Sequence, residues 1–293
     1  MRIAILSSSI GSYSTRRLRE ACTRRAHEAM VLSTLRFSLL VGVGQGGLFF
    51  RDQPLRKYDA VIPRIGASLS TFGTAVLRQF ECSGVFALNG SEAVSRARDK
   101  LWAMQLLSRA GVAVPPTAFT RDREGVAESI ARVGGAPLIL KLLTGTQGLG
   151  VVLAETMQAA TAVVDMLHSV QEHVLIQRFV RESGGRDVRA FVVGERVVAA
   201  IERRAADGEF RANLHRGARA SRVVLDPEFE RAAVRASQAL GLQVSGVDLV
   251  QGPEGPLVID VNASPGLEGV ETVTGIDVAG AIIEYLERQF TLR

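Results

Sequence analysis

The sequence predicts an α/β protein that begins with a small open domain of parallel strands and continues into a larger region of helices and strands. Short apolar runs alternate with helical patterns through the first third of the 293 residues, which is typical of a parallel sheet flanked by helices. A Pro-Pro pair at 115–116 then marks a boundary. After it, a strand-rich stretch from about 187 to 201 and two acidic strands near the C-terminus indicate a second unit.

The first third supplies the alternating elements. We expect strands over 2–6, 59–63 and 85–88, and helices over about 14–27 and 71–82. A further helix covers 96–111 and ends at Gly111. The motif VGVGQGG at 41–47 fails the spacing of a dinucleotide-binding loop and opens no βαβ unit, so it is interpreted as a flexible surface loop.

The rest of the chain mixes helices with strands. Helices are expected near 123–133 and 156–168, strands over 137–143, 151–154 and 174–177, and a polar loop through 221 after the strand-rich stretch. The best-marked helix runs from about 227 to 240, with Asp226 as N-cap, Pro227 in the first turn and Gly241 past its end. An amphipathic helix over about 277–290 closes the chain.

Composition excludes several classes of protein. At 47% hydrophobic residues the chain is long enough for about two compact domains, and its apolar runs are too short for a signal peptide or a membrane span. A soluble, cytoplasmic protein is therefore expected. Cys22 and Cys82 lack metal-ligand spacing, so neither a disulfide framework nor structural zinc is expected. The net charge of +5 favours acidic partners, but no basic stretch is interleaved with aromatics, so direct nucleic-acid binding is not expected.

Two acidic strands carry the most specific chemistry. VSGVDLV (244–250) and PLVIDVN (256–262) are joined by a turn-rich segment, and a hairpin centred near Glu254 places Asp248 opposite Asp260. Asn262 shares the face of Asp260. Opposed side chains lie about 4.5–5.5 Å apart, so two half-buried aspartates need protonation, a basic partner or a hard cation. Two carboxylates and an amide oxygen suit Mg²⁺ shared with nucleotide phosphates.

A lysine and a glycine loop point to the same ligand. Only three lysines occur, at 57, 100 and 141, and Lys141 interrupts the apolar run PLILKLL. An ammonium in a buried strand needs an anion. The loop GTQGLG (145–150) follows and can turn backbone N–H groups toward phosphate, although it lacks the Walker pattern and a plain hairpin turn explains it equally well by itself. Combined with Lys141 and the acidic hairpin, nucleotide binding is favoured.

Longer strings resemble a known family. PRIG, ARDKL with MQLL, GGAPL, GTQGLGVVLAE, AAIERRA, NLHRG, GVDL and VNASPGLEG with TGID resemble the RimK family of α-L-glutamate ligases in the ATP-grasp superfamily, over essentially the whole chain. The resemblance implies an N-terminal α/β domain (1–95) and a two-lobe ATP-grasp fold, with an N-lobe over 96–180 and a C-lobe over 181–293. It also implies ATP, two Mg²⁺ ions with Mn²⁺ as a substitute, free L-glutamate, an acceptor at the C-terminus of a small-subunit ribosomal protein, and a homo-oligomer, a tetramer in the family.

The resemblance also assigns residues. Lys100 and Lys141 match the lysines at the phosphates and adenine, the linker Gln177, Arg178, Phe179 and Val180 matches the adenine edge, and Asp187 matches the ribose. The glycine loop contributes Gly145, Thr146, Gln147 and Gly148, and a second phosphate loop contributes Arg211, Ala212 and Asn213. Asp248, Asp260 and Asn262 match the magnesium ligands. Taken alone, Gln177 or Asp187 would be an ordinary strand residue.

Three positions depart from the family pattern or remain open. Asp260 stands where the family has Glu, and the shorter side chain predicts reduced activity or altered metal preference. Gly246 stands where related ligases have an arginine that stabilises the tetrahedral oxyanion, so Arg203 or Arg216 is a candidate catalytic substitute, with a surface arginine as the alternative. Arg64 in PRIG is a candidate for binding a substrate carboxylate, with helix capping or a salt bridge as the alternative.

The implied reaction forms an amide bond. The acceptor carboxylate attacks the γ-phosphate of ATP to give an acylphosphate, and the amine of glutamate then displaces phosphate. Two alternatives stay open: a ligase of the same superfamily with a small-molecule or carrier-protein acceptor, and an ATP-binding regulatory module whose turnover is weakened by Asp260.

Overall fold

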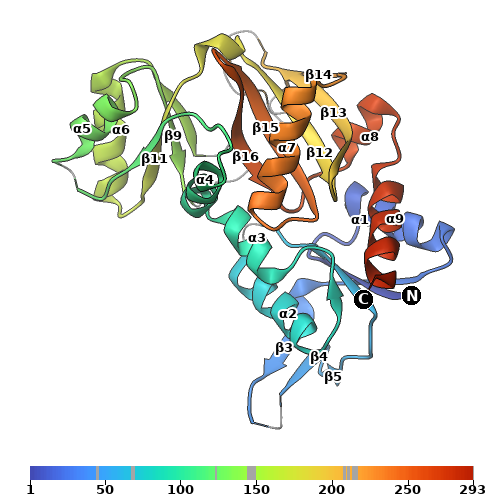
Figure 1. The fold of residues 1–293 in the computed structure, drawn as a ribbon. Helices are drawn as coiled ribbons and strands as arrows, with labels where there is room; N and C mark the ends of the chain where they lie inside the picture. Colours follow the sequence, from blue (N-terminus) through green and yellow to red (C-terminus); the bar gives the residue numbers. More distant parts are fainter. Residues whose placement is uncertain are drawn as a thin grey trace.

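A computed structural model describes residues 1–43, 46–66, 70–122, 124–143, 150–206, 209, 212 and 217–292. Figure 1 shows three parts: an N-terminal unit at the bottom and right, a small lobe at the upper left, and a large lobe at the upper right. The two termini lie side by side, next to helices α1 and α9. Over the described residues, no helix is both long and apolar enough to cross a bilayer.

The N-terminal unit is built on a parallel sheet, as the alternating pattern predicts. Its strand order is β2-β1-β6-β7, and β1 lies parallel to both β2 and β6. Five of the six residues of β1 are buried, which explains its unbroken apolar run. The elements are β1 (Arg2–Ser7), α1 (Tyr13–Arg24), β2 (Glu28–Leu32), β6 (Ala60–Arg64), α2 (Ser70–Cys82) and β7 (Phe86–Ala87).

A three-stranded antiparallel sheet projects from this unit at the bottom of Figure 1. It comprises β3 (Phe37–Leu40), β4 (Gly47–Phe50) and β5 (Gln53–Pro54). The segment 41–47 connects two antiparallel strands rather than a strand to a helix, in agreement with the rejection of a dinucleotide loop; Gly44 and Gln45 fall outside the described residues.

The expectation of one helix over 96–111 is wrong. Two helices, α3 (Ser91–Arg98) and α4 (Lys100–Arg109), meet at Asp99, whose backbone is extended. The Asp99 carboxylate accepts a hydrogen bond of 2.9 Å from the backbone N–H of Trp102 and so caps the second helix. The break turns the chain and places Lys100 at the start of α4.

The small lobe is an antiparallel sheet with the strand order β10-β9-β11-β8, covered by two helices. The elements are β8 (Thr117–Phe119), α5 (Val126–Arg132), β9 (Leu138–Leu142), β10 (Val151–Ala154), α6 (Met157–Ser169) and β11 (Val174–Arg178). This lobe has its own apolar core, which includes Ile130, Leu138 and Ile176.

The large lobe is a five-stranded antiparallel sheet with the order β14-β13-β12-β15-β16. Helix α7 packs on β15 and β16, and α8 packs on β13 and β14. The elements are β12 (Arg186–Val193), β13 (Arg196–Arg204), β14 (Arg219–Arg222), α7 (Pro227–Ala239), β15 (Val244–Gly252), β16 (Gly255–Asn262), α8 (Glu268–Thr274) and α9 (Val278–Thr291).

Three sequence expectations change in this lobe. The polar stretch through 221 ends in strand β14, which pairs with β13, and α8 was not expected. Asp226 does precede the first turn of α7, and Pro227 is in that turn, but the Asp226 side chain makes no capping hydrogen bond. The acidic hairpin is confirmed: Asp248 pairs with Asp260, and a bulge follows Asp248.

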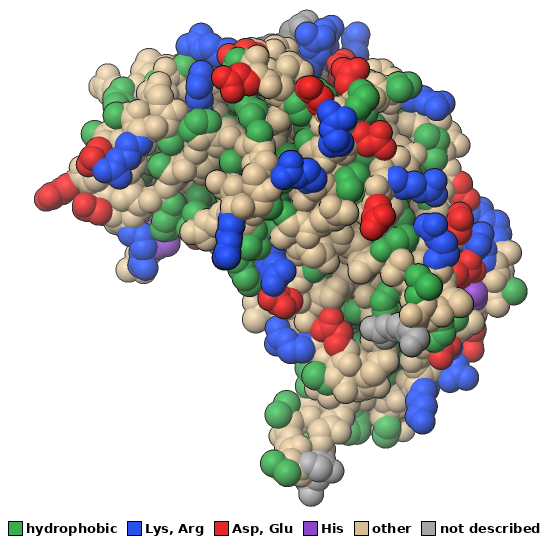
Figure 2. All heavy atoms as spheres, viewed as in Figure 1, with side chains coloured by type: hydrophobic (Ala, Val, Ile, Leu, Met, Phe, Trp, Pro, Cys, Tyr) green, Lys and Arg blue, Asp and Glu red, His purple; other side chains and the backbone are tan. Residues whose placement is uncertain are grey.

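Two of the three parts share their cores. One apolar cluster joins Ile3 and Ile62 of the N-terminal unit to Phe191 and Ile282 of the large lobe. Arg17 of α1 reinforces this contact, with ion pairs of 2.9 Å to Glu271 and to Asp277. The small lobe is therefore the part with a separate core. On the face shown in Figure 2, acidic and basic side chains are interspersed.

Candidate nucleotide and metal site

A cavity of about 1360 Å³ lies where the three parts meet. It is lined by strand ends of the N-terminal unit, by the small lobe and by the acidic hairpin. The residues that the sequence assigns to the site and that line this cavity are Lys100, Lys141, Gln177, Arg178, Phe179, Val180, Asp187, Arg203, Ala212, Asp248, Asp260 and Asn262, together with Arg64. Sequence-distant motifs thus converge on one space.

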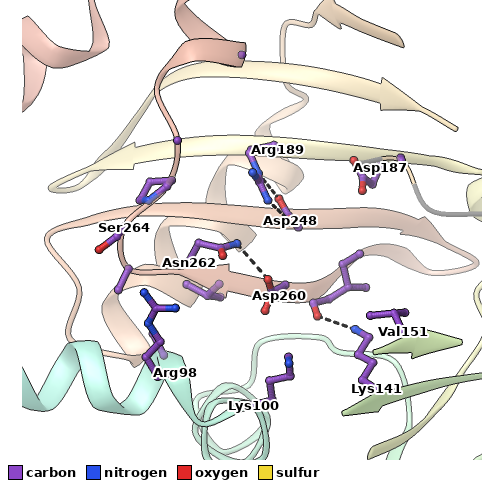
Figure 3. Close-up of a pocket in the computed structure, with 18 of the residues that line it drawn as sticks. Arg98, Lys100, Lys141, Val151, Asp187, Arg189, Asp248, Asp260, Asn262 and Ser264 are labelled. Atoms are coloured by element: carbon purple, nitrogen blue, oxygen red, sulfur yellow. Dashed lines mark hydrogen bonds and ion pairs between the residues drawn. The ribbon is translucent and has the colours of Figure 1, made fainter. Parts of the chain in front are cut away.

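Two lysines enter the cavity from below the hairpin, as Figure 3 shows. The ammonium of Lys141, on β9, donates to the carbonyl of Ile259 at 3.0 Å, and that of Lys100 donates to the carbonyl of Leu142 at 2.8 Å. Burial lowers the pKa of both lysines, and the negative charge of Asp260 opposes that shift. Both ammonium groups hold backbone carbonyls beside a carboxylate.

The two aspartates of the hairpin have different surroundings. Arg189 grips Asp248 with two hydrogen bonds of 2.6 Å, and Arg203 approaches the same carboxylate at 3.2 Å. Asp260 accepts a hydrogen bond of 3.1 Å from the amide of Asn262 and faces the lysines. Cross-strand aspartates are tolerated here because one of them is neutralised by arginines.

A second bidentate pair extends this network. Arg203 donates to both carboxylate oxygens of Asp187, at 2.6 and 2.8 Å. The exposed fraction is only 3% for Arg203 and 6% for Asp248, so each depends on its partner. Burial by itself would raise the pKa of Asp248, but the charges of Arg189 and Arg203 outweigh it and lower the pKa to about 2. Asp248 is therefore ionised at neutral pH.

The side chains at the hairpin have the ligand type that a hard cation prefers. Asp248, Asp260 and Asn262 offer only oxygen ligands, as Mg²⁺ requires. A carboxylate has about four lone-pair positions, and the arginines occupy three on Asp248, which leaves one toward a cation. Within the described part of the chain, no three His, Cys, Asp or Glu side chains cluster, so a zinc-type site is not formed there.

The linker between the lobes uses part of its backbone internally. The N–H of Arg178 donates to the carbonyl of Pro116 at 2.9 Å, and that of Phe179 donates to the carbonyl of Pro137 at 3.3 Å. Gln177 is buried and donates its side-chain amide to Thr117. Val180 follows these three positions at the cavity wall.

Several assigned residues lie outside the described part of the chain. They are Gly145, Thr146, Gln147 and Gly148 of the glycine loop, and Arg211, Asn213 and Arg216. Ala212 is described and is buried at the cavity wall.

Sequence reasoning missed Arg189, which binds Asp248. A signal existed, because Asp187 and Arg189 are two apart on a strand and share a face. Their partners are set by strand register, which pairs Asp187 with Arg203 and Arg189 with Asp248. No local sequence motif predicts that register.

The fold and the site define an ATP-grasp class of protein: an antiparallel small lobe carries Lys141, helix α4 begins with Lys100, and an antiparallel large lobe carries the carboxylates across the same cavity. Comparison with known families agrees. The RimK PreATP-grasp domain matches residues 1–94, and the RimK-like ATP-grasp domain matches residues 97–286. The chain belongs to the RimK-like ATP-grasp family.

Individual relatives give the same picture. A protein of Azotobacter vinelandii described as a probable alpha-L-glutamate ligase is 52% identical over 288 residues, which cover 98% of this chain and 96% of that protein. A RimK domain ATP-grasp protein from Sphaerobacter thermophilus has a crystal structure that is 26% identical, with a TM-score of 0.69, and covers 97% of this chain and 99% of that one. The ATP-grasp ligase PsnB, complexed with a phosphomimetic variant of its minimal precursor, Mg and ADP, shares the fold at 24% identity, with a TM-score of 0.74 and 98% coverage of both chains.

Proposed function

We propose that this protein is an ATP- and Mg²⁺-dependent ligase that adds L-glutamate through α-linked amide bonds to the C-terminus of a ribosomal small-subunit protein. Membership of the RimK-like ATP-grasp family supports the ligase class, and relatives at about half identity support glutamate as a substrate. The observation that carries the proposal is the single cavity in which Lys100 and Lys141 face Asp260 and Asn262.

The proposed nucleotide contacts follow from charge and position. Lys100 and Lys141 are assigned to the phosphates because they are partly desolvated cations that gain a strong anion there. The linker from Gln177 to Val180 is assigned to the adenine. Since the N–H groups of Arg178 and Phe179 already bond within the small lobe, adenine contact falls to Val180 and to linker carbonyls.

Asp248, Asp260 and Asn262 would hold Mg²⁺, with Mn²⁺ as a substitute. When bound, the ion supplies positive charge to the phosphate oxygens. Asp187 is assigned to the ribose, where its carboxylate is held in place by Arg203.

The reaction needs positioning and charge neutralisation more than acid–base chemistry. The acceptor carboxylate attacks the γ-phosphate, the bond between that phosphorus and the bridging oxygen of ADP breaks, and an acylphosphate forms. The amine of glutamate then attacks the acyl carbon, loses a proton and expels phosphate. Lys141 and Lys100 offset the charge on the phosphates in the first step.

Of the two candidates for stabilising the oxyanion of the second step, Arg203 lies in the part of the chain that the structure describes. Its Nε and one terminal nitrogen are committed to Asp187 and Asp248, which leaves the other terminal nitrogen for a reacting oxygen. Arg216 is the second candidate. Retention of wild-type turnover in both Arg203→Ala and Arg216→Ala would remove this assignment.

One incubation series tests the function. Protein, ATP, Mg²⁺ and L-glutamate are combined with a peptide from the C-terminus of a small-subunit ribosomal protein, with small acids, or without acceptor, and ADP and acceptor mass are measured. ADP formation with glutamate added only to the ribosomal peptide supports the proposal. Glutamylation of a small acid alone replaces the acceptor, and tight ATP binding without any ADP favours a regulatory module. Light scattering of the purified protein tests the homo-oligomer that the family implies.

A further inference from the structure

The N-terminal unit presents a crevice to the cavity at a point of its sheet where ligands are often bound. In the order β2-β1-β6-β7, the chain leaves β1 toward one edge of the sheet and β6 toward the other, so these two neighbouring strands form the topological switch point. In open parallel sheets, ligands bind outside the carboxyl ends of the strands at this point. Ser7 at the end of β1 pairs in register with Arg64 at the end of β6, and both line the cavity.

Two arginines lie at this crevice. Arg64 donates to the carbonyl of Pro265 at 2.8 Å, and Arg98, the last residue of α3, donates to the carbonyl of Ile65. Both line the cavity. Among the described residues, neither guanidinium forms an ion pair with a carboxylate, and Nε of Arg98 is buried without a hydrogen-bond partner. The salt-bridge alternative for Arg64 is therefore not supported by any described residue.

This arrangement is unfavourable without an anion. Burial and the neighbouring charge of Arg98 lower the pKa of Arg64 to about 10, and burial lowers the pKa of Arg98. Two like charges that are partly desolvated and face a shared space raise the free energy of the empty site. A bidentate anion in that space would accept hydrogen bonds from both arginines and offset the repulsion.

The position of Arg98 relates the crevice to the reaction. Figure 3 shows its side chain pointing toward the end of β16 that carries Asn262 and the following Ser264, and Lys100 begins the next helix. The charge of Asp260 acts on both Arg98 and Lys100. A group held by Arg98 would therefore lie next to the place where the phosphates are proposed to bind.

We propose that Arg64 and Arg98 together bind a carboxylate of the ligase's substrates in the crevice at the ends of β1 and β6. The inference rests on the proposed function for the identity of the ligand, and it adds a binding site on the N-terminal unit. Two sources supply the same chemistry: the C-terminal residue of the acceptor and free glutamate. A carboxylate matches the planar guanidinium groups in shape as well as charge.

The test uses equilibrium binding by calorimetry to the full chain saturated with Mg²⁺ and a non-hydrolysable ATP analogue. The proteins are wild type, Arg64→Gln, Arg98→Gln and Arg78→Gln, the last a control because Arg78 is an exposed residue of α2. The ligands are L-glutamate, L-glutamine, L-isoglutamine, and a glutamate-terminated acceptor peptide with a free or an amidated C-terminus. The affinities of acid and amide ligands are also compared on the wild-type protein, so this measurement does not depend on the folding of a variant.

We expect Arg64→Gln and Arg98→Gln to weaken one acid ligand by roughly 10- to 100-fold, the range for hydrogen bonds to a charged group. The wild type should discriminate against the matching amide by a similar factor, and the variants should not. Loss for the free-acid peptide names the acceptor as the source, and loss for glutamate names the amino acid. Arg78→Gln should bind every ligand as the wild type does.

Two results would overturn the site: both variants binding all acids within about twofold of the wild type, less than the loss of one hydrogen bond, or both weakening only the ATP analogue. Failure of the proposed function looks different, because the wild type would then form no ADP in the incubation series while carboxylate binding through the two arginines could still be measured. Wild-type ligation with unchanged binding in both variants removes the site and leaves the ligase.

Discussion

Arginines at the two ends of the cavity differ in the groups that they bind. At the hairpin end, Arg189 and Arg203 are bound to Asp248 and Asp187 at 2.6–2.8 Å, so their charge is neutralised within the fold. At the crevice end, Arg64 and Arg98 bond to backbone carbonyls. The residue type is the same, but one set supports the fold of the lobe and the other is suited to bind a ligand.

The difference shows why residue type alone does not assign function in this chain. With 35 basic residues, of which only those at 57, 100 and 141 are lysines, an arginine occurs on average about every nine positions. Several of these arginines, such as Arg2, Arg24 and Arg132, form exposed ion pairs, which contribute little to stability. The informative feature is a partly buried guanidinium and whether the fold supplies its anion.

The largest effect is expected where a paired arginine loses its anion. Asp248→Asn leaves Arg189 and Arg203 facing a neutral amide in a buried network, and breaking a buried pair in this way lowers the free energy of unfolding by about 3 kcal/mol or more. Urea unfolding monitored by circular dichroism measures this. Asp165→Asn is the matched control, since Asp165 is exposed on α6. A loss below about 1 kcal/mol, the range of a surface pair, would show that the network does not support the lobe.

Next in size is the loss of Lys141, a buried cation that forms no salt bridge with any described residue and donates instead to a backbone carbonyl. Lys141→Met should weaken ATP binding by roughly 10- to 100-fold, as expected when a charge-assisted hydrogen bond is lost. Stability of the ATP-free protein should change little, because the lost bond to Ile259 is offset by the relief of a desolvated charge. Calorimetric titration and thermal melting give the two readouts, with the exposed Lys57→Met as control. A large drop in melting temperature with unchanged ATP affinity would make Lys141 a structural lysine.

A pH effect of the same lysine should be smaller. Burial lowers the pKa of Lys141 in the free protein, and bound phosphate favours its charged form, so ATP binding takes up protons between the lowered pKa and the higher pKa of the complex. Affinity should therefore fall as the pH rises through the interval between these two pKa values. Calorimetry in two buffers of different ionisation enthalpy measures the uptake, which Lys141→Met should abolish. Equal heats in both buffers for the wild type would contradict this assignment.

Much of the fold follows from local pattern. The buried run of β1, the Pro227 and Gly241 boundaries of α7 and the hairpin that pairs Asp248 with Asp260 are all set by neighbouring residues. The break at Asp99 was missed because an apolar pattern runs through it, although aspartate is a strong N-cap. Strand β14 was missed because its burial is slight and its pairing with β13 is long-range.

The residues of the site also fall into those that local sequence predicts and those that it does not. Lys141 and the hairpin carboxylates were predictable because a charge inside an apolar run needs a partner. Arg189 and Arg98 were not, since their roles depend on which strands are neighbours and on how α3 meets the crevice at β6. Sequence indicates that a charge must be balanced, but only the fold shows what balances it.

The smallest expected effect concerns Asp260, where the sequence resemblance leads us to expect a glutamate. Asp260→Glu should lower the Mg²⁺ concentration that gives half-maximal ADP formation. The change should be less than the roughly tenfold effect that follows loss of a group supporting a metal ligand. The longer side chain reaches further into the cavity, and Mg²⁺ demands near-ideal geometry. Asp260→Asn, which removes the charge, should raise that Mg²⁺ concentration instead. If the glutamate variant instead needs more Mg²⁺ than the wild type, the shorter carboxylate fits the ion better in this chain. The physical reason would be the three cations Arg98, Lys100 and Lys141, on which the charge of Asp260 acts.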